Sequence, residues 1–311
     1  MLKKIFGELF MKNVFNSLLY YLVIIPLSLL PFPLLYAIST GLYVIFYYIA
    51  GYRKKVVLQN IRNSFPEKSD AEINLICKKF YKHFCDLVVE SIKAFTISQH
   101  QITKRFYVIN PEVMDKYHDE GKSVLVAGGH FNNWEILAVG IDQCIKHKAS
   151  GIYTPLSNKY FDDKMQLTRK RYGLQLVSSR AVKRFFESSL DQLTATIFAI
   201  DQSPSNPKSA YWMKFLNQET GVLYGIEKFA KDYNYPVLYG TINKVKRGHY
   251  NLFLVDVSPN PAASPYGEII EKTQALLEQD IMQHPEFWLW THKRWKHKRP
   301  ADMQMNNLLK R

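Results

Sequence analysis

The sequence predicts a three-layer α/β fold, in which a largely parallel sheet lies between helices, preceded by an N-terminal apolar membrane anchor. From residue 123 onward, apolar β-branched runs alternate with helical patterns. Residues 123–141 also read as a strand, a glycine turn and a helix, the order expected in a βα unit. The third observation is an uncharged stretch near the N-terminus. We expect residues 1–55 to form the anchor and residues 56–311 the folded domain.

The uncharged stretch extends from Asn13 to Tyr52 and consists mostly of Leu, Ile, Val, Phe and Tyr. As one helix it would be about 60 Å long, roughly twice the hydrocarbon core of a bilayer. Pro26, Pro31 and Pro33 interrupt it, so a kinked span and a shallow re-entrant hairpin both fit. Both flanks are basic, which leaves the orientation of a single span open and suits a hairpin with two cytosolic ends: Lys3, Lys4, Lys12, Arg53, Lys54 and Lys55. A buried helix pair is the alternative.

The remaining elements follow from capping and periodicity. Ser69 and Glu72 have the spacing of a capping box, which predicts a helix over 70–95. A shorter helix is expected at 111–118. Beyond it, the β-branched runs predict strands at 123–127, 150–154, 174–177, 194–200, 236–243 and 250–257. The amphipathic runs predict helices at 133–146, 158–172, 181–190, 220–233 and 266–283.

The segment Gly128–Glu135 follows the first of these strands, and it is the most informative part of the chain. Its two glycines permit a sharp turn at the strand end. Asn132 or Asn133 can cap the following helix, and Glu135 falls in the first turn, where the helix dipole favours a carboxylate. Ligands of parallel sheets bind outside the carboxyl ends of the strands, where His130 is placed. The segment predicts a catalytic base oriented by an acid; a surface histidine near a glutamate is the alternative.

Composition narrows the class of partner. The 41 Lys and Arg against 27 Asp and Glu give a net charge of +14, which attracts nucleic acid, anionic lipid or an acidic protein. We expect no nucleic-acid partner, since no nucleic-acid-binding motif accompanies the charge. Cys77, Cys85 and Cys144 form no C-x-x-C pair, and His292 and His297 lack companion ligands, so no metal and no cofactor are expected. Nucleophile-elbow and dinucleotide-binding motifs are also missing from the sequence.

Several blocks in the same order resemble the bacterial late acyltransferases of lipid A biosynthesis, the lauroyl and myristoyl transferases. These belong to the wider glycerolipid acyltransferase group defined by H-x4-D/E. The most specific block is 129–135, G-H-F-N-N-W-E, and the closing block 285–295 reads P-E-F-W-L-W-T-H-K-R-W. At 215–217, F-L-N stands where relatives usually carry F-F-G. The resemblance covers nearly the whole chain and includes Asn60, Phe65, Pro66, Glu67, Tyr153, Asn158, Asp162, Arg169, Arg171, Asp201 and Gln202.

This resemblance implies a glycerolipid-acyltransferase-like fold that transfers a fatty acyl group from an acyl carrier protein thioester to a hydroxyl of a lipid A precursor. It also implies a place on the inner membrane, with the catalytic domain facing the cytoplasm. An alcohol is a poor nucleophile at neutral pH, so we expect His130 to remove its proton, and Glu135 to accept from the far ring nitrogen. No Ser or Cys nucleophile is indicated, which predicts direct attack without an acyl-enzyme.

Seven further residues are candidates at this site. Arg169 is the side chain best suited to stabilise the oxyanion, with a solvated helix face as the alternative. Asp201 could position substrate, pair with Arg169 or cap a helix. Trp134 could pack the turn or contact acyl chains. The remaining candidates for substrate binding are Asn133, Arg171, Gln202 and Arg294. Arg294 belongs to a basic run, 293–299, that could steer an acidic carrier protein and a phosphorylated lipid.

Two other functions compete with this one. The same chemistry could act on another glycolipid or on an aminolipid acceptor. A member of another class, a non-catalytic membrane-bound lipid-binding protein, could keep the fold and lose the reaction.

Overall fold

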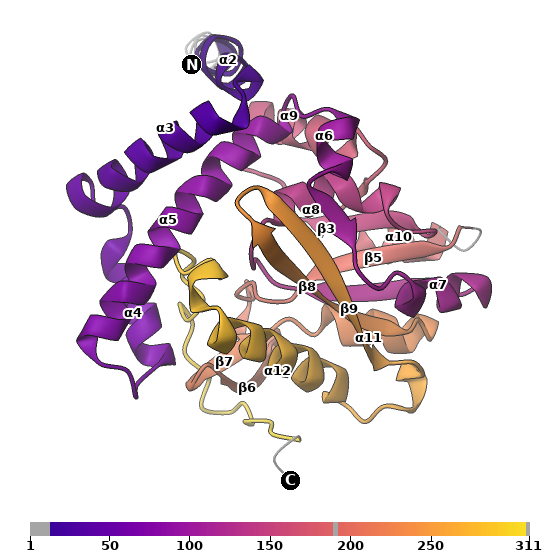
Figure 1. The fold of residues 1–311 in the computed structure, drawn as a ribbon. Helices are drawn as coiled ribbons and strands as arrows, with labels where there is room; N and C mark the ends of the chain where they lie inside the picture. Colours follow the sequence, from indigo (N-terminus) through magenta and orange to yellow (C-terminus); the bar gives the residue numbers. More distant parts are fainter. Residues whose placement is uncertain (1–12, 189–191, 309–311) are drawn as a thin grey trace, which may run out of the picture.

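The computed structural model describes residues 13–188 and 192–308, and a seven-stranded sheet lies at its centre (Figure 1). The strand order is β1-β9-β8-β2-β5-β3-β4, and five of the six neighbouring pairs are parallel. Only β8 and β9 pair antiparallel within this sheet. The strands are β1 (Phe106–Val108), β2 (Val124–Gly128), β3 (Lys148–Tyr153), β4 (Gln175–Ser178), β5 (Thr194–Ala199), β8 (Val237–Lys246) and β9 (His249–Ser258). The predicted strands are confirmed to within a few residues, and β1 is an addition.

Helices cover both faces of the sheet, which confirms the three-layer α/β fold (Figure 1). Side chains alternate along β2: Leu125 and Ala127 enter one core with α10, α11 and α12, while Val124 and Val126 enter the other with α7 and α8. The helices of the domain are α4 (Lys54–Ser64), α5 (Asp70–Ala94), α6 (Gln99–Thr103), α7 (Glu112–Asp119), α8 (Trp134–Gly140), α9 (Lys159–Lys170), α10 (Val182–Ser188), α11 (Gly225–Tyr233) and α12 (Glu268–Gln283). The last two residues of the helix predicted at 181–190 lie outside the described residues.

The long helix α5 begins at the predicted capping box. The Oγ of Ser69 accepts from the backbone N–H of Glu72, and the Glu72 carboxylate accepts from the backbone N–H of Ser69 at 2.9 Å. The helix then runs past the N-terminal helices on one side and α8 on the other (Figure 1). It therefore connects the apolar N-terminal segment to the part of the domain that follows β2.

One predicted helix begins at the wrong residue. The helix expected over 220–233 starts only at Gly225, because residues before it form a separate hairpin of β6 (Tyr211–Phe215) and β7 (Gln218–Val222). Leu216 and Asn217 make its two-residue turn, both with positive φ, 48° and 62°. Such a turn matches the twist of a hairpin, and Asn tolerates it more readily than Leu. The departure at 215–217 noted in the sequence is this turn.

The apolar N-terminal segment consists of two helical arms. The first contains η1 (Leu19–Ile24) and α2 (Ile25–Leu29), and the second contains α3 (Phe32–Val44) and η2 (Ile45–Ile49). An extended residue, Leu30, separates them just before Pro31. Residues 32–49 are long and apolar enough to cross a membrane, and 22% of that window is buried. The lysines predicted to flank the first arm, Lys3, Lys4 and Lys12, lie outside the described residues.

The second arm packs along α5. On the side facing α5, the hydroxyl of Ser39 donates to Asp86 at 2.7 Å and that of Tyr36 donates to Glu90 at 2.9 Å. The other side exposes large apolar side chains, among them Leu34, Val44, Ile45, Tyr48 and Ile49. An exposed apolar surface of this kind is typical of a site that contacts a membrane or another protein.

Candidate active site

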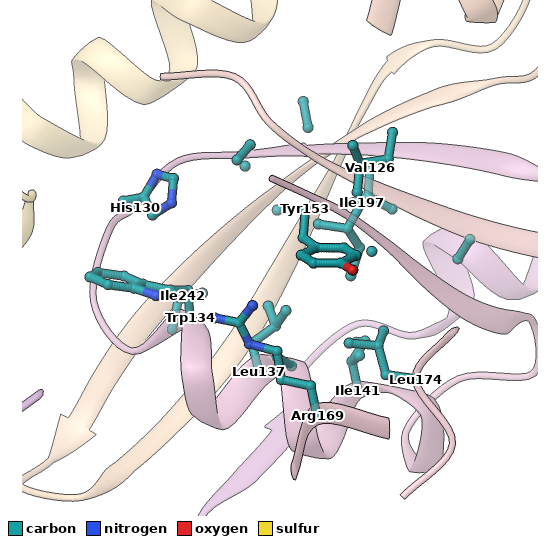
Figure 2. A pocket seen from close by; sticks show the side chains of 18 of the residues that line it. Val126, His130, Trp134, Leu137, Ile141, Tyr153, Arg169, Leu174, Ile197 and Ile242 are labelled. Atoms are coloured by element: carbon teal, nitrogen blue, oxygen red, sulfur yellow. The ribbon is translucent and has the colours of Figure 1, made fainter. Parts of the chain in front are cut away.

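A cavity of about 310 Å³ opens at the carboxyl ends of the central strands, as expected for a largely parallel sheet (Figure 2). It extends between the sheet and α8, and its lining is mostly apolar. The apolar side chains come from strands, from α8 and from the segments beside them, and include Val126, Leu137, Ile141, Leu174, Ile197 and Ile242. His130, Trp134 and Arg169 lie close together at the cavity (Figure 2), and Gln202 also lines it.

His130 stands in the turn between β2 and α8, which has a fixed backbone. Asn132 adopts a left-handed conformation, φ 55°, and its side chain donates to the backbone oxygen of Ile242 at 2.7 Å. Asn133 is the helix cap: its side-chain oxygen accepts from the backbone N–H of Ile136 at 2.9 Å. Its side-chain nitrogen donates to Glu90 at 2.5 Å. Asn133, predicted as a candidate for substrate binding, is 2% exposed and serves to hold the turn.

The carboxylate partner of His130 is Asp201, which follows the end of β5. One carboxylate oxygen lies 2.7 Å from Nδ1 of the ring, and the other accepts from the backbone N–H of His130 at 2.7 Å. That second oxygen also accepts from the indole N–H of Trp288 at 2.9 Å. These contacts leave Nε2 as the ring nitrogen able to exchange a proton with a ligand, since His130 lines the cavity.

Glu135 has a different partner from the predicted one. Its two oxygens accept from Arg169, from Nε at 3.0 Å and from Nη2 at 2.6 Å, and Trp134 donates to it at 3.2 Å. The prediction of a hydrogen bond from His130 to Glu135 is therefore wrong for this structure, as is the suggested pairing of Asp201 with Arg169. The structure brings His130, Asp201, Glu135 and Arg169 together, but with partners other than those predicted.

The bidentate pair fixes the guanidinium of Arg169, whose side chain is 23% exposed and faces the cavity (Figure 2). Nη1 is the guanidinium nitrogen that does not bind Glu135. The alternative of an arginine on a solvated helix face does not describe this residue. Arg169 lies at the same end of the cavity as His130 and Trp134, where a developing negative charge could be met.

Electrostatics favour the charged forms of the first pair. Burial lowers the pKa of His130, but the attraction of Asp201 and the hydrogen bond between them outweigh it, and the pKa is raised. Burial opposes the charge of Asp201, yet its contacts with His130 and Trp288 hold the pKa of that carboxyl well below its usual range. The pair can therefore stabilise an imidazolium formed when His130 accepts a proton.

Trp134 and Gln202 also lie at the cavity. The indole ring of Trp134 meets the imidazole of His130 edge to face, with centroids 5.2 Å apart, so this residue both packs against the base and lines the cavity. Gln202 follows Asp201 and lines the same opening. Both residues therefore stand where a bound substrate would pass.

Two other predicted residues, Arg171 and Arg294, do not line the cavity. Arg171 donates to the backbone oxygen of Phe95 at 2.6 Å, a contact between α5 and the end of α9. Arg294 is 2% exposed, and burial lowers its pKa to about 10 although Asp201 opposes the shift. The prediction that Arg294 belongs to a surface that steers substrates is thus wrong. Lys293, Lys296 and Lys298 of the same run remain exposed.

The closing segment contributes a functional contact that the sequence analysis did not assign. The backbone N–H of Asn132 donates to Phe287 at 2.9 Å, and that of Leu289 donates to His130 at 3.2 Å. Trp288, between them, donates to Asp201. The tryptophans of the closing block were a signal for this segment, but they did not indicate what it contacts.

In the described part of the chain, no group of three or more His, Cys, Asp or Glu side chains is arranged to hold a metal ion. The site instead combines a histidine held by a buried carboxylate, an arginine held by another, and a long apolar cavity. These features suit acid–base chemistry beside an apolar substrate.

Comparison with known proteins gives the family. The family model described as bacterial lipid A biosynthesis acyltransferase matches residues 6–297. The chain is similar to the lipid A biosynthesis palmitoleoyltransferase of Escherichia coli K12, with 21% identity over 269 residues and 86% of each chain covered. It is 22% identical over 272 residues to the lauroyltransferase of the same organism, covering 86% of this chain and 87% of that one. A lipid A biosynthesis acyltransferase of Shigella flexneri is 21% identical over 269 residues, with 86% of each chain covered.

This chain belongs to the bacterial lipid A biosynthesis acyltransferase family, and it is an acyltransferase that acts in lipid A biosynthesis. The family assignment inferred from the ordered blocks is confirmed. An enzyme of this family is not the non-catalytic lipid-binding protein considered as an alternative.

Proposed function

We propose that the enzyme transfers a fatty acyl group from an acyl carrier protein thioester to a hydroxyl of a lipid A precursor, with His130 as general base. The observation that carries this proposal is the position of His130, held by Asp201 at the polar end of a mostly apolar cavity. The acyl chain of the donor lies in the cavity, so its thioester carbonyl is held beside Nε2.

The reaction proceeds by direct attack. The acceptor hydroxyl passes its proton to Nε2 of His130 as its oxygen bonds to the thioester carbonyl carbon. The tetrahedral intermediate then collapses, the carbon–sulfur bond breaks, and the imidazolium returns the proton to the leaving thiolate. Among the described lining residues of the cavity there is no Ser or Cys, which supports a mechanism without an acyl-enzyme.

Asp201 stabilises the positive charge that forms on His130, and Arg169 stabilises the negative charge that forms on the thioester oxygen. Asp201 accepts from Nδ1–H, which keeps Nε2 free as the acceptor and stabilises the imidazolium. Arg169, fixed by Glu135, offers a preorganised donor to the oxyanion, and one such donor is typically worth about 2.7–4 kcal/mol. In this scheme Glu135 is a positioning residue that acts through Arg169.

Different parts of the enzyme contact the donor and the membrane. The net charge of +14 favours encounter with an acidic carrier protein. Residues 13–52 attach the enzyme to the cytoplasmic side of the inner membrane through their exposed apolar side chains. Because Tyr36 and Ser39 fasten the second arm to α5, attachment as a shallow hairpin is favoured over a span. Asn16 contacts Asn158, near Leu156 of the cavity lining, so the cavity opens close to this anchor.

The experiment compares purified wild-type enzyme with His130→Ala in detergent, using an acyl carrier protein thioester and a tetra-acylated lipid A precursor. Loss of transfer by a protein that remains folded is expected, because the variant lacks the base. Mass spectrometry of the glycolipid product measures the transfer. Full activity in His130→Ala would refute the mechanism, and a wild-type enzyme that acylates only another glycolipid or an aminolipid would refute the acceptor.

A further inference from the structure

A second apolar groove, of about 380 Å³, lies beyond the carboxyl ends of β3, β4 and β5. Its apolar walls come from two strands and from α11 with the residues before it: Ile152, Phe198, Ile200, Leu223, Ile226 and Phe229. Leu223 is 40% exposed, and Phe229 stacks on the buried Phe186 with centroids 4.6 Å apart. We call this hollow the second groove; no step of the mechanism above uses it.

The second groove and the main cavity lie on opposite faces of the same sheet. Along β5, Ala195 and Ile197 face the main cavity, whereas Phe198 and the following Ile200 face the second groove. Strand geometry requires this, because successive side chains point to opposite faces. The two hollows therefore lie on either side of the sheet along β5.

The hollows meet near the carboxyl ends of β3 and β5. The residues that line both of them are Ile152, Tyr153, Thr154, Ala199 and Gln202. His130, Trp134 and Arg169 line the main cavity alone. A molecule in the second groove thus reaches the reacting groups across the shared rim, from the side opposite to a chain that fills the main cavity.

The rim of the second groove is basic. Arg180 and Lys183 both line it and both are exposed. Lys183 contacts Glu187 at 3.7 Å, but with its side chain 84% exposed this pair is weak in water. An apolar groove bordered by two cations fits a ligand that joins a hydrocarbon chain to an anionic group.

We propose that the second groove binds one acyl chain of the acceptor, a phosphorylated and multiply acylated glycolipid, with Arg180 and Lys183 beside an anionic group of its head. This proposal rests on the proposed function and adds the site of its second substrate. The donor chain occupies the main cavity, the acceptor chain occupies the second groove, and the acceptor hydroxyl reaches His130 over the rim that the two hollows share. Each substrate then has its own apolar site on its own face of the sheet.

Gly225, at the start of α11, allows the second groove to be filled without a clash. A Cβ added there would meet only the ring of Phe198, at 3.9 Å, an ordinary contact. In Gly225→Phe the ring occupies the space of several chain carbons, so we expect the KM for the acceptor to rise at least tenfold, on the order of the loss of two buried methylenes. The KM for the acyl donor should stay within twofold of wild type.

Gly151 supplies the matched control in the main cavity. A Cβ there would meet Leu174 at 3.6 Å, again without a clash. Gly151→Leu should change the preference for donor chain length and leave the acceptor KM near the wild-type value. A second arm reverses the rim charge: Arg180→Glu with Lys183→Glu should raise the KM for the phosphorylated acceptor more than for the same glycolipid after phosphatase treatment.

Equilibrium binding of the radiolabelled acceptor glycolipid to the full-length enzyme in detergent separates this proposal from the proposed function. At least tenfold weaker binding to Gly225→Phe supports the groove even if transfer to this lipid is not catalysed. Wild-type acceptor binding and KM in a folded Gly225→Phe would overturn it, as would a change confined to donor KM. If Gly225→Phe does not fold, Leu223→Glu places a carboxylate in the same groove at an already exposed position, with the same outcomes expected.

Discussion

Replacing Asp201 by asparagine changes one oxygen at the centre of the site. In the wild type, Asp201 accepts three hydrogen bonds, from the backbone N–H of His130, from its ring and from Trp288. An amide oxygen can keep the backbone and indole donors, which turns the amide NH2 toward Nδ1 of His130. Nδ1 must then be an acceptor, so the neutral ring carries its proton on Nε2. That is the nitrogen that has to accept the proton of the substrate hydroxyl.

The expected loss follows from this exchange of tautomers. We expect kcat for acyl transfer by Asp201→Asn to fall by roughly 10⁴-fold, the cost of the same tautomer change in serine proteases, or about 5.4 kcal/mol in the barrier. The melting temperature should change little, because the side chain keeps its volume. Single-turnover transfer from an acyl carrier protein thioester, followed by mass spectrometry, measures the chemical step.

The pH dependence gives a second, independent readout. The base acts when it is neutral, so activity appears as pH rises through the pKa of His130. Asp201 raises that pKa against the effect of burial. Its removal must lower the pKa, and the acid limb of kcat/KM should move to lower pH although the plateau is much reduced. A limb that stays in place would show that Asp201 does not hold the charge of this ring.

Glu135→Gln is the matched comparison, since it neutralises the other acid of the site. It weakens the bidentate contact with Arg169, and we expect a loss of about 10²–10³-fold with a smaller shift of the acid limb. The reasoning fails if the order is reversed, with Glu135→Gln more damaging and more shifted than Asp201→Asn. That result would restore Glu135 as the partner of His130.

Two further predictions concern the main cavity and the turn. Gly151→Leu adds four carbons to the cavity, which at about 0.8 kcal/mol per buried methylene should shift donor preference toward shorter chains by roughly 3 kcal/mol. Competition between carrier-bound donors of different length measures this, and an unchanged preference would place the donor chain elsewhere. Tyr250→Phe removes a donor to the buried Glu90 and should lower the free energy of unfolding by about 1–3 kcal/mol in urea titrations. No loss of stability would mean that the other donors to Glu90 suffice.

Much of the fold was predictable because its signals are local. β-branched runs marked the strands, and the pair Ser69 and Glu72 marked the start of α5. The hairpin of β6 and β7 was missed for a local reason too. Val222 stands four residues before Ile226, so it continues the helical spacing of α11, and the turn contains Leu216, which is unusual at positive φ. The helical pattern of α11 was therefore extended, wrongly, into the residues of β7.

The site was predictable only in its composition. The partner of His130 was sought five residues away, whereas Asp201 lies 71 positions later in the chain, just after β5. Only the pairing of β2 with β5, with the N–H of Ile200 bonded to the oxygen of Gly128, brings the two together. Strand order is a property of the whole sheet, and no motif spacing contains it. The contact of Trp288 with Asp201 likewise joins residues far apart in the chain, and no motif spacing predicts it.

The bonds from residues 287–289 to the turn that contains His130 can form only after those residues have been synthesised. Phe287 and Trp288 are synthesised long after that turn, yet they contact its backbone and Asp201. A nascent chain whose apolar N-terminal arms have already formed would still lack these contacts with the turn and with Asp201. A chain interrupted before residue 287 would therefore lack the hydrogen bond from Trp288 to Asp201, and acyl transfer would require residues 287–289.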